Sequence, residues 1–292
     1  MALLDARCTS CGAALKVNGA LDAANCESCG AAFVVEKAVR NFYVNIQAQN
    51  VVVQGGVRED FEIRGGVLVK YHGNAEEVVI PDGVVEIGKG AFHDCAVLRR
   101  VILPEGIERI GESAFMNCRR LEATSLPDGL TEICDEAFRN CASLADIRFS
   151  SSVQKIGRSA FGKCAALTKL SVPANVTQVD IFAFSDCAAL TEVIIYAEDI
   201  ELLTGAFGDC GNLERVVLEG KTVKNSSHSA PFDHCGKLTI VQIGQSVEQF
   251  DRGMFYDTPC YKSRNKGFTV SCWRCGGKKW NGSLCKQCGL MH

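Results

Sequence analysis

One phenylalanine recurs at nearly constant spacing through the middle of the chain. It stands at eight positions, 23 residues apart except for one interval of 25: Phe92, Phe115, Phe138, Phe161, Phe184, Phe207, Phe232 and Phe255. A cysteine follows each of the first seven by three residues, and a leucine follows each cysteine by three more. So many positions repeating in register indicate a chain built from stacked units.

Apolar and polar residues alternate in each unit after the leucine. Val101 and Leu103 show the pattern in an early unit, and Ile147 and Phe149 show it in a later one. This period of two predicts a strand with one buried face. A proline or small turn residue usually follows, and a second short apolar segment leads to the next phenylalanine. We expect each unit to be a strand, a turn, a short extended piece and a helical turn.

A single unit cannot enclose its own apolar side chains, so neighbouring units must bury them by stacking. We therefore predict a β-rich solenoid over residues 61–260, right-handed and parallel-stranded, with about eight 23-residue coils and short helical turns. Residues 61–71 are typical of a hairpin around two glycines that closes the N-terminal end. In the last coil Thr258 and Tyr261 replace the usual cysteine and leucine, as expected of a C-terminal cap.

The repeated unit is clearest in residues 78–98, VVIPDGVVEIGKGAFHDCAVL. It resembles the BspA-type leucine-rich repeat over roughly residues 61–260. The resemblance implies a curved solenoid used in protein–protein contact and adhesion, with no catalytic residues. Many members of that family are exported, whereas this chain lacks the basic start and apolar run of a secretory signal. We expect a cytoplasmic protein.

The recurrent cysteines, here called the cysteine column, allow two interpretations. They are Cys95, Cys118, Cys141, Cys164, Cys187, Cys210 and Cys235. Stacked strands would bring neighbouring Cα atoms within disulfide range, which would suit a redox or metal-binding role. Equivalent side chains in stacked coils point the same way, however, and buried cysteine acts as a small hydrophobe with a weak S–H donor. We expect structural thiols in an interior corner.

Paired CxxC motifs lie on both sides of the repeat. Cys8, Cys11, Cys26 and Cys29 enclose a spacer of 14 residues, and Cys272, Cys275, Cys285 and Cys288 enclose one of nine. A glycine follows the second cysteine of every motif, where a turn with positive φ has no steric penalty. Both sets fit tetrahedral zinc bound by four thiolates, and both segments resemble zinc ribbons.

These flanking segments bury too little apolar area to fold alone, so zinc binding should supply most of their folding free energy. Four thiolates leave no open coordination position, which argues against metal-assisted hydrolysis. We predict two structural zinc ions and four parts of the chain. The parts are a zinc ribbon at 1–40, a linker or edge strand at 41–60, the solenoid at 61–260 and a basic zinc ribbon at 261–292.

The outward positions of the predicted strands form the candidate surface for a protein partner, here called the outward strip. Its candidate contact residues are Arg100, Arg148, Lys169, Glu192, Ile194, Arg215 and Val217. A solvated face does not need the exposed apolar side chains of Ile194 and Val217, although scattered exposed apolar residues are also ordinary. A loop at 221–229, in the 25-residue interval, is either a binding feature or sequence drift.

Composition and charge add two points. With 47% hydrophobic and 22% charged residues the chain is typical of a core-forming soluble protein, and no apolar run is long enough to span a membrane. The net charge of -3 conceals a basic segment, residues 261–292, which has seven basic side chains and no acidic one. With Trp273 and Trp280 this segment could bind single-stranded nucleic acid. Alternatively the tryptophans pack the ribbon or dock it on the acidic solenoid.

Catalysis is not expected, because an enzyme needs polar groups that converge in a pocket. The five histidines show no spacing that would provide such a set: His72, His93, His228, His234 and His292. The sequence therefore predicts a non-catalytic interaction scaffold with structural zinc. Nucleic-acid binding through the basic ribbon is the alternative.

Metal analysis of the purified chain tests the ribbon assignment. We expect about two zinc ions per chain, because each set of four thiolates holds one ion. Replacing Cys8 and Cys11 by serine should remove one ion and leave the other. Fewer than one zinc ion per chain in the unaltered protein would contradict both sites.

Overall fold

The computed structural model describes residues 60–225, 230–244 and 246–262, together with short strands nearer the two ends of the chain. The chain divides into two compact units, Met1–Gln54 and Gly55–His292. No helix in the described part is long and apolar enough to cross a membrane.

The first unit contains two antiparallel hairpins. Strand β1 (Leu3–Arg7) pairs with β2 (Ala14–Asn18), and β3 (Ala23–Asn25) pairs with β4 (Ala32–Val34). The connections, residues 8–13 and 26–31, are equal in length, and each carries one predicted CxxC motif. The four cysteines themselves lie outside the described residues.

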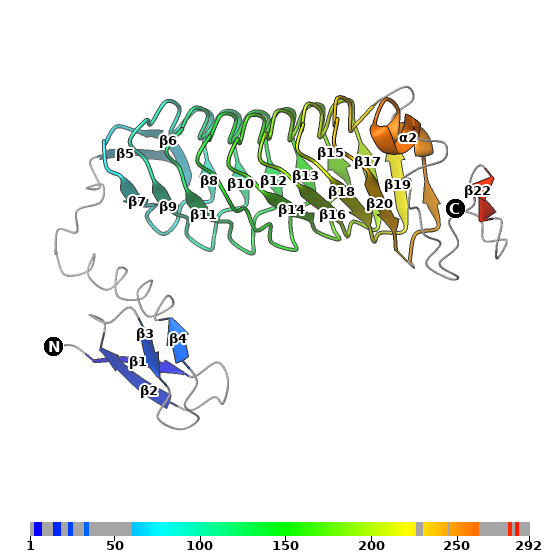
Figure 1. Ribbon diagram of the computed structural model, residues 1–292. Helices are drawn as coiled ribbons and strands as arrows, with labels where there is room; N and C mark the ends of the chain where they lie inside the picture. The colour runs from blue at the N-terminus through cyan, green and yellow to red at the C-terminus, as the bar shows by residue number, and fades with distance from the viewer. Residues whose placement is uncertain are drawn as a thin grey trace. The chain divides into compact units, whose positions relative to one another are not determined.

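The second unit is a solenoid with a long sheet along one side (Figure 1). Its ten strands follow one another from β5 to β21, and every neighbouring pair is parallel except the hairpin of β5 and β6. The strands are β5 (Phe61–Arg64), β6 (Val67–Tyr71), β8 (Glu86–Ile87), β10 (Arg109–Ile110), β12 (Glu132–Ile133), β13 (Lys155–Ile156), β15 (Gln178–Val179), β17 (Asp199–Leu202), β19 (Thr222–Asn225) and β21 (Gln249–Phe250). The hairpin predicted at 61–71 is present, with both glycines at positive φ.

The strands after each leucine form two further parallel sheets. One contains β7 (Glu77–Val79), β9 (Arg100–Ile102) and β11 (Ala123–Ser125). The other contains β14 (Lys169–Val172), β16 (Glu192–Ile195), β18 (Arg215–Leu218) and β20 (Ile240–Ile243).

The strand predicted at Ile147 and Phe149 does not form, which separates these two sheets. Ile147 still points into the core, but Phe149 stands where neighbouring coils have an aliphatic residue. Its ring lies edge-on to Phe161, with centroids 5.5 Å apart, and to Phe184 at 6.4 Å. We attribute the break to the volume of this ring, since cores tolerate extra volume only by displacing backbone or side chains.

The predicted helical turns are tight turns instead. In the first coil the turns close through bonds from the Ala91 N–H to the Gly88 carbonyl and from the His93 N–H to the Gly90 carbonyl. A residue of positive φ recurs two places before and two places after the phenylalanine, as at Ser113 (52°). Alternating φ signs prevent a continuous helix. From residue 61 onward, the helical elements of the described solenoid lie at its C-terminal end, at η2 (Arg252–Phe255) and α2 (Pro259–Lys262).

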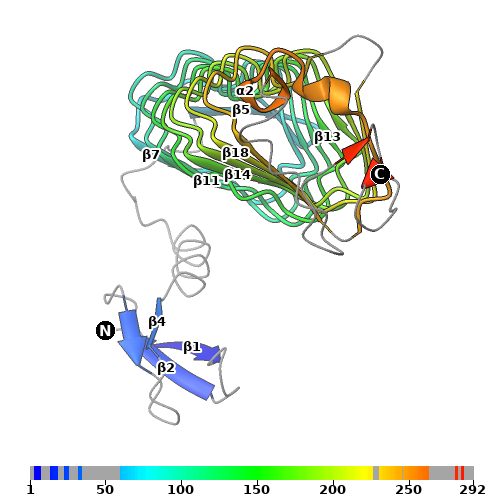
Figure 2. The ribbon, with the colours of Figure 1, turned by 45° about the vertical axis from the view of Figure 1, so that its right-hand side comes forward.

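The turns also stack through hydrogen bonds between coils. The N–H groups of Ser113, Phe115 and Asn117 donate to carbonyls of the next coil at 2.9, 2.7 and 2.9 Å. Successive coils repeat these contacts, so each coil joins its neighbour along the turns as well as along the strands. In Figure 2 the coils accordingly follow one another in nearly the same outline.

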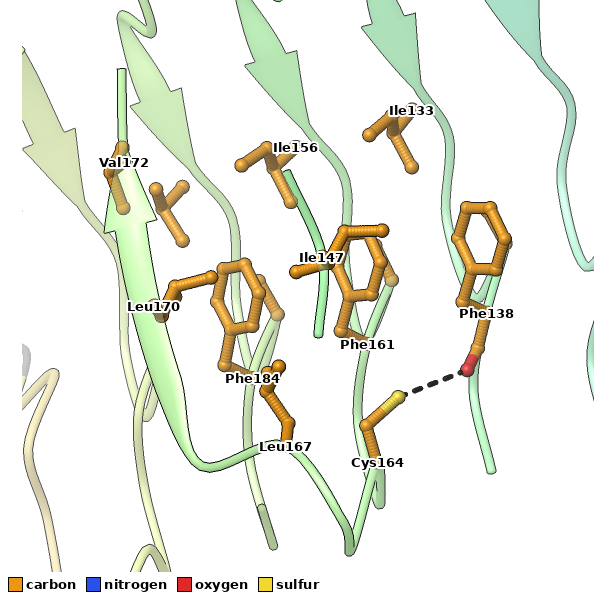
Figure 3. Close-up of a cluster of buried hydrophobic side chains, with 14 of the residues drawn as sticks. Ile133, Phe138, Ile147, Ile156, Phe161, Cys164, Leu167, Leu170, Val172 and Phe184 are labelled. Atoms are coloured by element: carbon orange, nitrogen blue, oxygen red, sulfur yellow. Dashed lines mark hydrogen bonds between the residues drawn. The ribbon is translucent and has the colours of Figure 1, made fainter. Parts of the chain in front are cut away.

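The recurrent phenylalanines form one interior file, as the spacing predicts. All eight are fully buried, and consecutive rings from Phe92 to Phe255 stack with centroids 4.9 to 5.4 Å apart. Figure 3 shows Phe138, Phe161 and Phe184 with their rings nearly parallel. Tyr71 extends the file into the N-terminal hairpin, stacking on Phe92 at 5.0 Å. The core is therefore continuous along the described solenoid.

Replacing Phe161 by alanine tests the importance of this file. The substitution should lower the free energy of unfolding by about 3–5 kcal/mol, because it leaves a cavity between two stacked rings. Denaturant unfolding monitored by circular dichroism measures the change. The matched control is Phe182→Ala, since Phe182 is 44% exposed and should lose less than about 1 kcal/mol. Equal losses in the two variants would contradict the special role of the file.

Candidate interaction surface

The outward strip contains charged side chains on β14, β16 and β18. These strands pair in register, so Lys169, Glu192 and Arg215 stand side by side. Glu192 forms an ion pair with each neighbour: its carboxylate lies 3.4 Å from the Lys169 Nζ and 3.0 Å from the Arg215 Nη1. Arg215 also donates to Gln242 on β20. The strand register alone therefore creates a row of alternating charge.

The strip has an apolar part in the same sheet. Ile194 is half-buried, and Ile240 on β20 is 40% exposed. The prediction that the Val217 side chain is exposed is wrong, because it is only 6% exposed. Val217 stands in register between Ile194 and Gln242, which flank it on neighbouring strands. The exposed apolar area of this sheet thus lies on Ile194 and Ile240 rather than on Val217.

The two other candidate arginines lie apart from this row. Arg100 is on β9, in the three-stranded sheet, 3.6 Å from the carboxylate of Glu77. Arg148 lies in the break between the sheets, with its side chain 90% exposed and 3.3 Å from Asp146. The strip is therefore two patches, one on each sheet, with Arg148 between them in sequence.

Sequence reasoning missed a second charged row on the ten-stranded sheet. Glu86, Arg109, Glu132 and Lys155 occupy equivalent positions on β8, β10, β12 and β13. Their successive contacts measure 2.7, 2.9 and 3.7 Å. The signal was present in the sequence as four charges of alternating sign spaced 23 residues apart.

The thiols of the cysteine column form hydrogen bonds between neighbouring coils. Six of its thiols donate to the carbonyl of the phenylalanine one coil earlier, at 3.1 to 3.4 Å: Cys118, Cys141, Cys164, Cys187, Cys210 and Cys235. Figure 3 shows this bond between Cys164 and Phe138. Burial raises the pKa of the Cys164 thiol to about 12. The thiol therefore stays protonated and able to donate its hydrogen bond at neutral pH.

Cys95 differs from the rest of the column. It belongs to the first coil and is only partly buried. Hydrogen-bonding contact with Cys118 lowers its pKa, burial opposes that effect, and the nearby charge of Lys70 lowers it further. Among the column thiols whose pKa is shifted, only that of Cys95 has its pKa lowered, which favours the thiolate.

The predicted zinc ligands Cys8, Cys11, Cys26, Cys29, Cys272, Cys275 and Cys288 lie outside the described residues. Cys285 ends strand β23 (Leu284–Cys285), which pairs antiparallel with β22 (Trp280–Asn281).

Comparison with known proteins agrees with the repeat. The family model described as "BspA type Leucine rich repeat region (6 copies)" matches residues 69–180 and 155–267. The chain belongs to this BspA-type leucine-rich repeat family. Leucine-rich repeat proteins generally act as protein-interaction scaffolds, and their fold is typically non-catalytic.

Two solved structures extend the likeness to three dimensions. The T. pallidum Leucine Rich Repeat protein (TpLRR) is 30% identical, with a TM-score of 0.56, over 70% of this chain and 97% of that one. A leucine-rich repeat protein from Bacteroides ovatus is 26% identical, with a TM-score of 0.53, over 68% of this chain and 54% of that one. A search of the curated proteins gives no match.

Alkylation of the folded chain with iodoacetamide tests the thiol environments. At about pH 8 Cys95 should react, because its pKa is lowered and thiolate is the nucleophile. Cys164 should react only after unfolding, since its raised pKa keeps it protonated. Mass spectrometry of peptides measures both rates in one sample. Labelling of Cys164 as fast as Cys95 would contradict the assigned geometry.

Proposed function

We propose that this chain is a non-catalytic protein–protein interaction scaffold that binds its partner through the four-stranded sheet β14, β16, β18 and β20. The observation that carries the proposal is the row of Lys169, Glu192 and Arg215 beside the apolar side chains of Ile194 and Ile240. Leucine-rich repeat proteins generally use such extended repeat surfaces for binding.

The strand ladder suits this role because it fixes the spacing of the side chains. Within the sheet the strands already pair with one another, so a partner is recognised mainly through outward side chains. Charged groups in fixed register favour a partner of complementary pattern and reject like charge. The exposed isoleucines add apolar area that leaves water on binding.

We also propose that the flanking ribbons hold two structural zinc ions. In the first unit each CxxC motif occupies the connection between two antiparallel strands, with the same offset from its flanking strands. Such a placement suits ligands that close the ends of hairpins. The thiolates of Cys8, Cys11, Cys26 and Cys29 would hold one ion, and those of the C-terminal motifs would hold the other. Bound zinc would stabilise segments that bury little apolar area.

The alternative function is nucleic-acid binding by residues 261–292. Their seven basic side chains and two tryptophans favour phosphate contact and base stacking. Binding by this route should weaken steeply with salt and vanish when residues 268–292 are deleted. A protein partner bound through the four-stranded sheet should survive the same deletion.

A pull-down with the full-length chain tests the scaffold. The double substitution Lys169→Glu and Ile194→Glu should reduce recovery of the partner at least tenfold, because it reverses one charge of the row and buries one unpaired charge on binding. Val85→Glu is the matched control, since Val85 is an exposed aliphatic residue beside β8 on the other sheet. Recovery unchanged by the double substitution, or lost equally with the control, would contradict the assigned surface.

A further inference from the structure

The stacked turns form a column of side chains that no proposed function uses. The column, here called the turn column, contains the residue two places after each phenylalanine: Asp94, Asn117, Asn140, Lys163, Asp186, Asp209, His234 and Asp257. All eight have positive φ, between 57 and 70°. Because neighbouring coils stack closely, each side chain in the column adjoins those one coil before and after it.

Near its N-terminal end the turn column is satisfied by its own amides. Asn117 donates to Asp94 at 2.8 Å, and Asn140 donates to Asn117 at 2.8 Å. No ion is needed where each side chain donates to the one before it.

Near the C-terminal end the turn column has a histidine surrounded by carboxylates. The Nδ1 of His234 lies 3.2 Å from an oxygen of Asp209 and 3.7 Å from one of Asp233. Asp233, His234 and Asp257 each offer one potential ligand atom, and these three atoms lie within 4.8 Å of one another. Asp209, His234 and Asp257 come from three successive coils, and Asp233 precedes the histidine. Three potential ligands therefore gather around one point of the surface, and Asp209 lies beside the histidine.

The chemistry of this group suits a divalent transition-metal ion. Two ligands about 2.1 Å from one ion are separated by at most about 4.2 Å, so a spread of 4.8 Å needs only small side-chain movements. One imidazole nitrogen with carboxylate oxygens is a donor set that Mn²⁺ and Zn²⁺ accept. The histidine side chain is 63% exposed, which leaves room for water to complete the coordination.

We propose that Asp233, His234 and Asp257, supported by Asp209, bind one divalent transition-metal ion at the C-terminal end of the turn column. The site is separate from the cysteine ribbons, because its ligands are nitrogen and oxygen rather than sulfur. The ion would tie the last three coils together through their side chains and offset the charge of three neighbouring carboxylates.

Titration of the full-length protein with Mn²⁺ tests the site, after dialysis has removed all zinc except that held by the thiolate ribbons, with free Mn²⁺ followed by electron paramagnetic resonance. Manganese prefers oxygen and nitrogen over thiolate, so the ribbons should not compete for it. We expect one saturable Mn²⁺ per chain. His234→Asn and Asp257→Asn should each weaken binding about tenfold or more, since each removes a ligand.

The chain itself provides the controls. Asparagine already occupies the turn column at Asn117 and Asn140 with positive φ, so both substitutions should keep the fold. Asp94→Asn is the matched variant, because Asp94 stands in the same column beside a histidine, His93, at 2.9 Å but outside the cluster. Its Mn²⁺ binding should equal that of the unaltered chain. Absence of saturable binding up to millimolar Mn²⁺, or binding unchanged in His234→Asn, would overturn the proposal.

Discussion

The structure depends on one constraint: every coil must form backbone hydrogen bonds with the next coil at equivalent positions of the repeat. The strands and the turns both meet it, as the bonds of Ser113, Phe115 and Asn117 to the following coil show. A coil with extra residues must therefore place them where they break no hydrogen bond between coils. The 25-residue interval does so between β19 and Phe232, and the rings of Phe207 and Phe232 still stack at 5.1 Å. Repeat length is thus fixed by hydrogen bonding, while the phenylalanine file fills the space that results.

The cysteine column follows from the same constraint. In the coils of Phe92, Phe115, Phe138 and Phe161 the phenylalanine carbonyl accepts an N–H from its own turn, as from Cys95 to Phe92 at 3.1 Å, and the thiol of the next coil supplies a second donor. In the last coil Thr258 takes the place of cysteine, and its hydroxyl donates to the Phe255 carbonyl of the same coil at 2.6 Å. The last coil has no following cysteine to supply that donor. The substitution that marks the cap in the sequence thus serves the chemistry of a terminal carbonyl.

Much of this fold could be predicted from the sequence, because apolar spacing reports which side chains face inward. The interior file, the N-terminal hairpin and the parallel strands follow from it. Apolar spacing does not report the volume of a side chain or the sign of its φ angle. For this reason the break at Phe149, the burial of Val217 and the turns in place of helices were missed. The recurrent Asp and Asn of the turn column were a usable signal for positive φ, since these residues tolerate the left-handed region. Lys163 and Phe182 adopt the same sign without any such signal.

In-register stacking makes the surface a set of columns in which each side chain meets its equivalents about 5 Å away. Like charges at that separation repel, so a column of ionised groups is favourable only if signs alternate or a counter-charge is present. The row from Glu86 to Lys155 alternates in sign, and its two negative and two positive charges balance. The C-terminal turn column does not alternate, since Asp186, Asp209 and Asp257 share one sign and only His234 interrupts them. A column that alternates is stabilised by its own members, whereas a column of mostly negative groups is stabilised by an external cation, as we propose for the C-terminal end of the turn column.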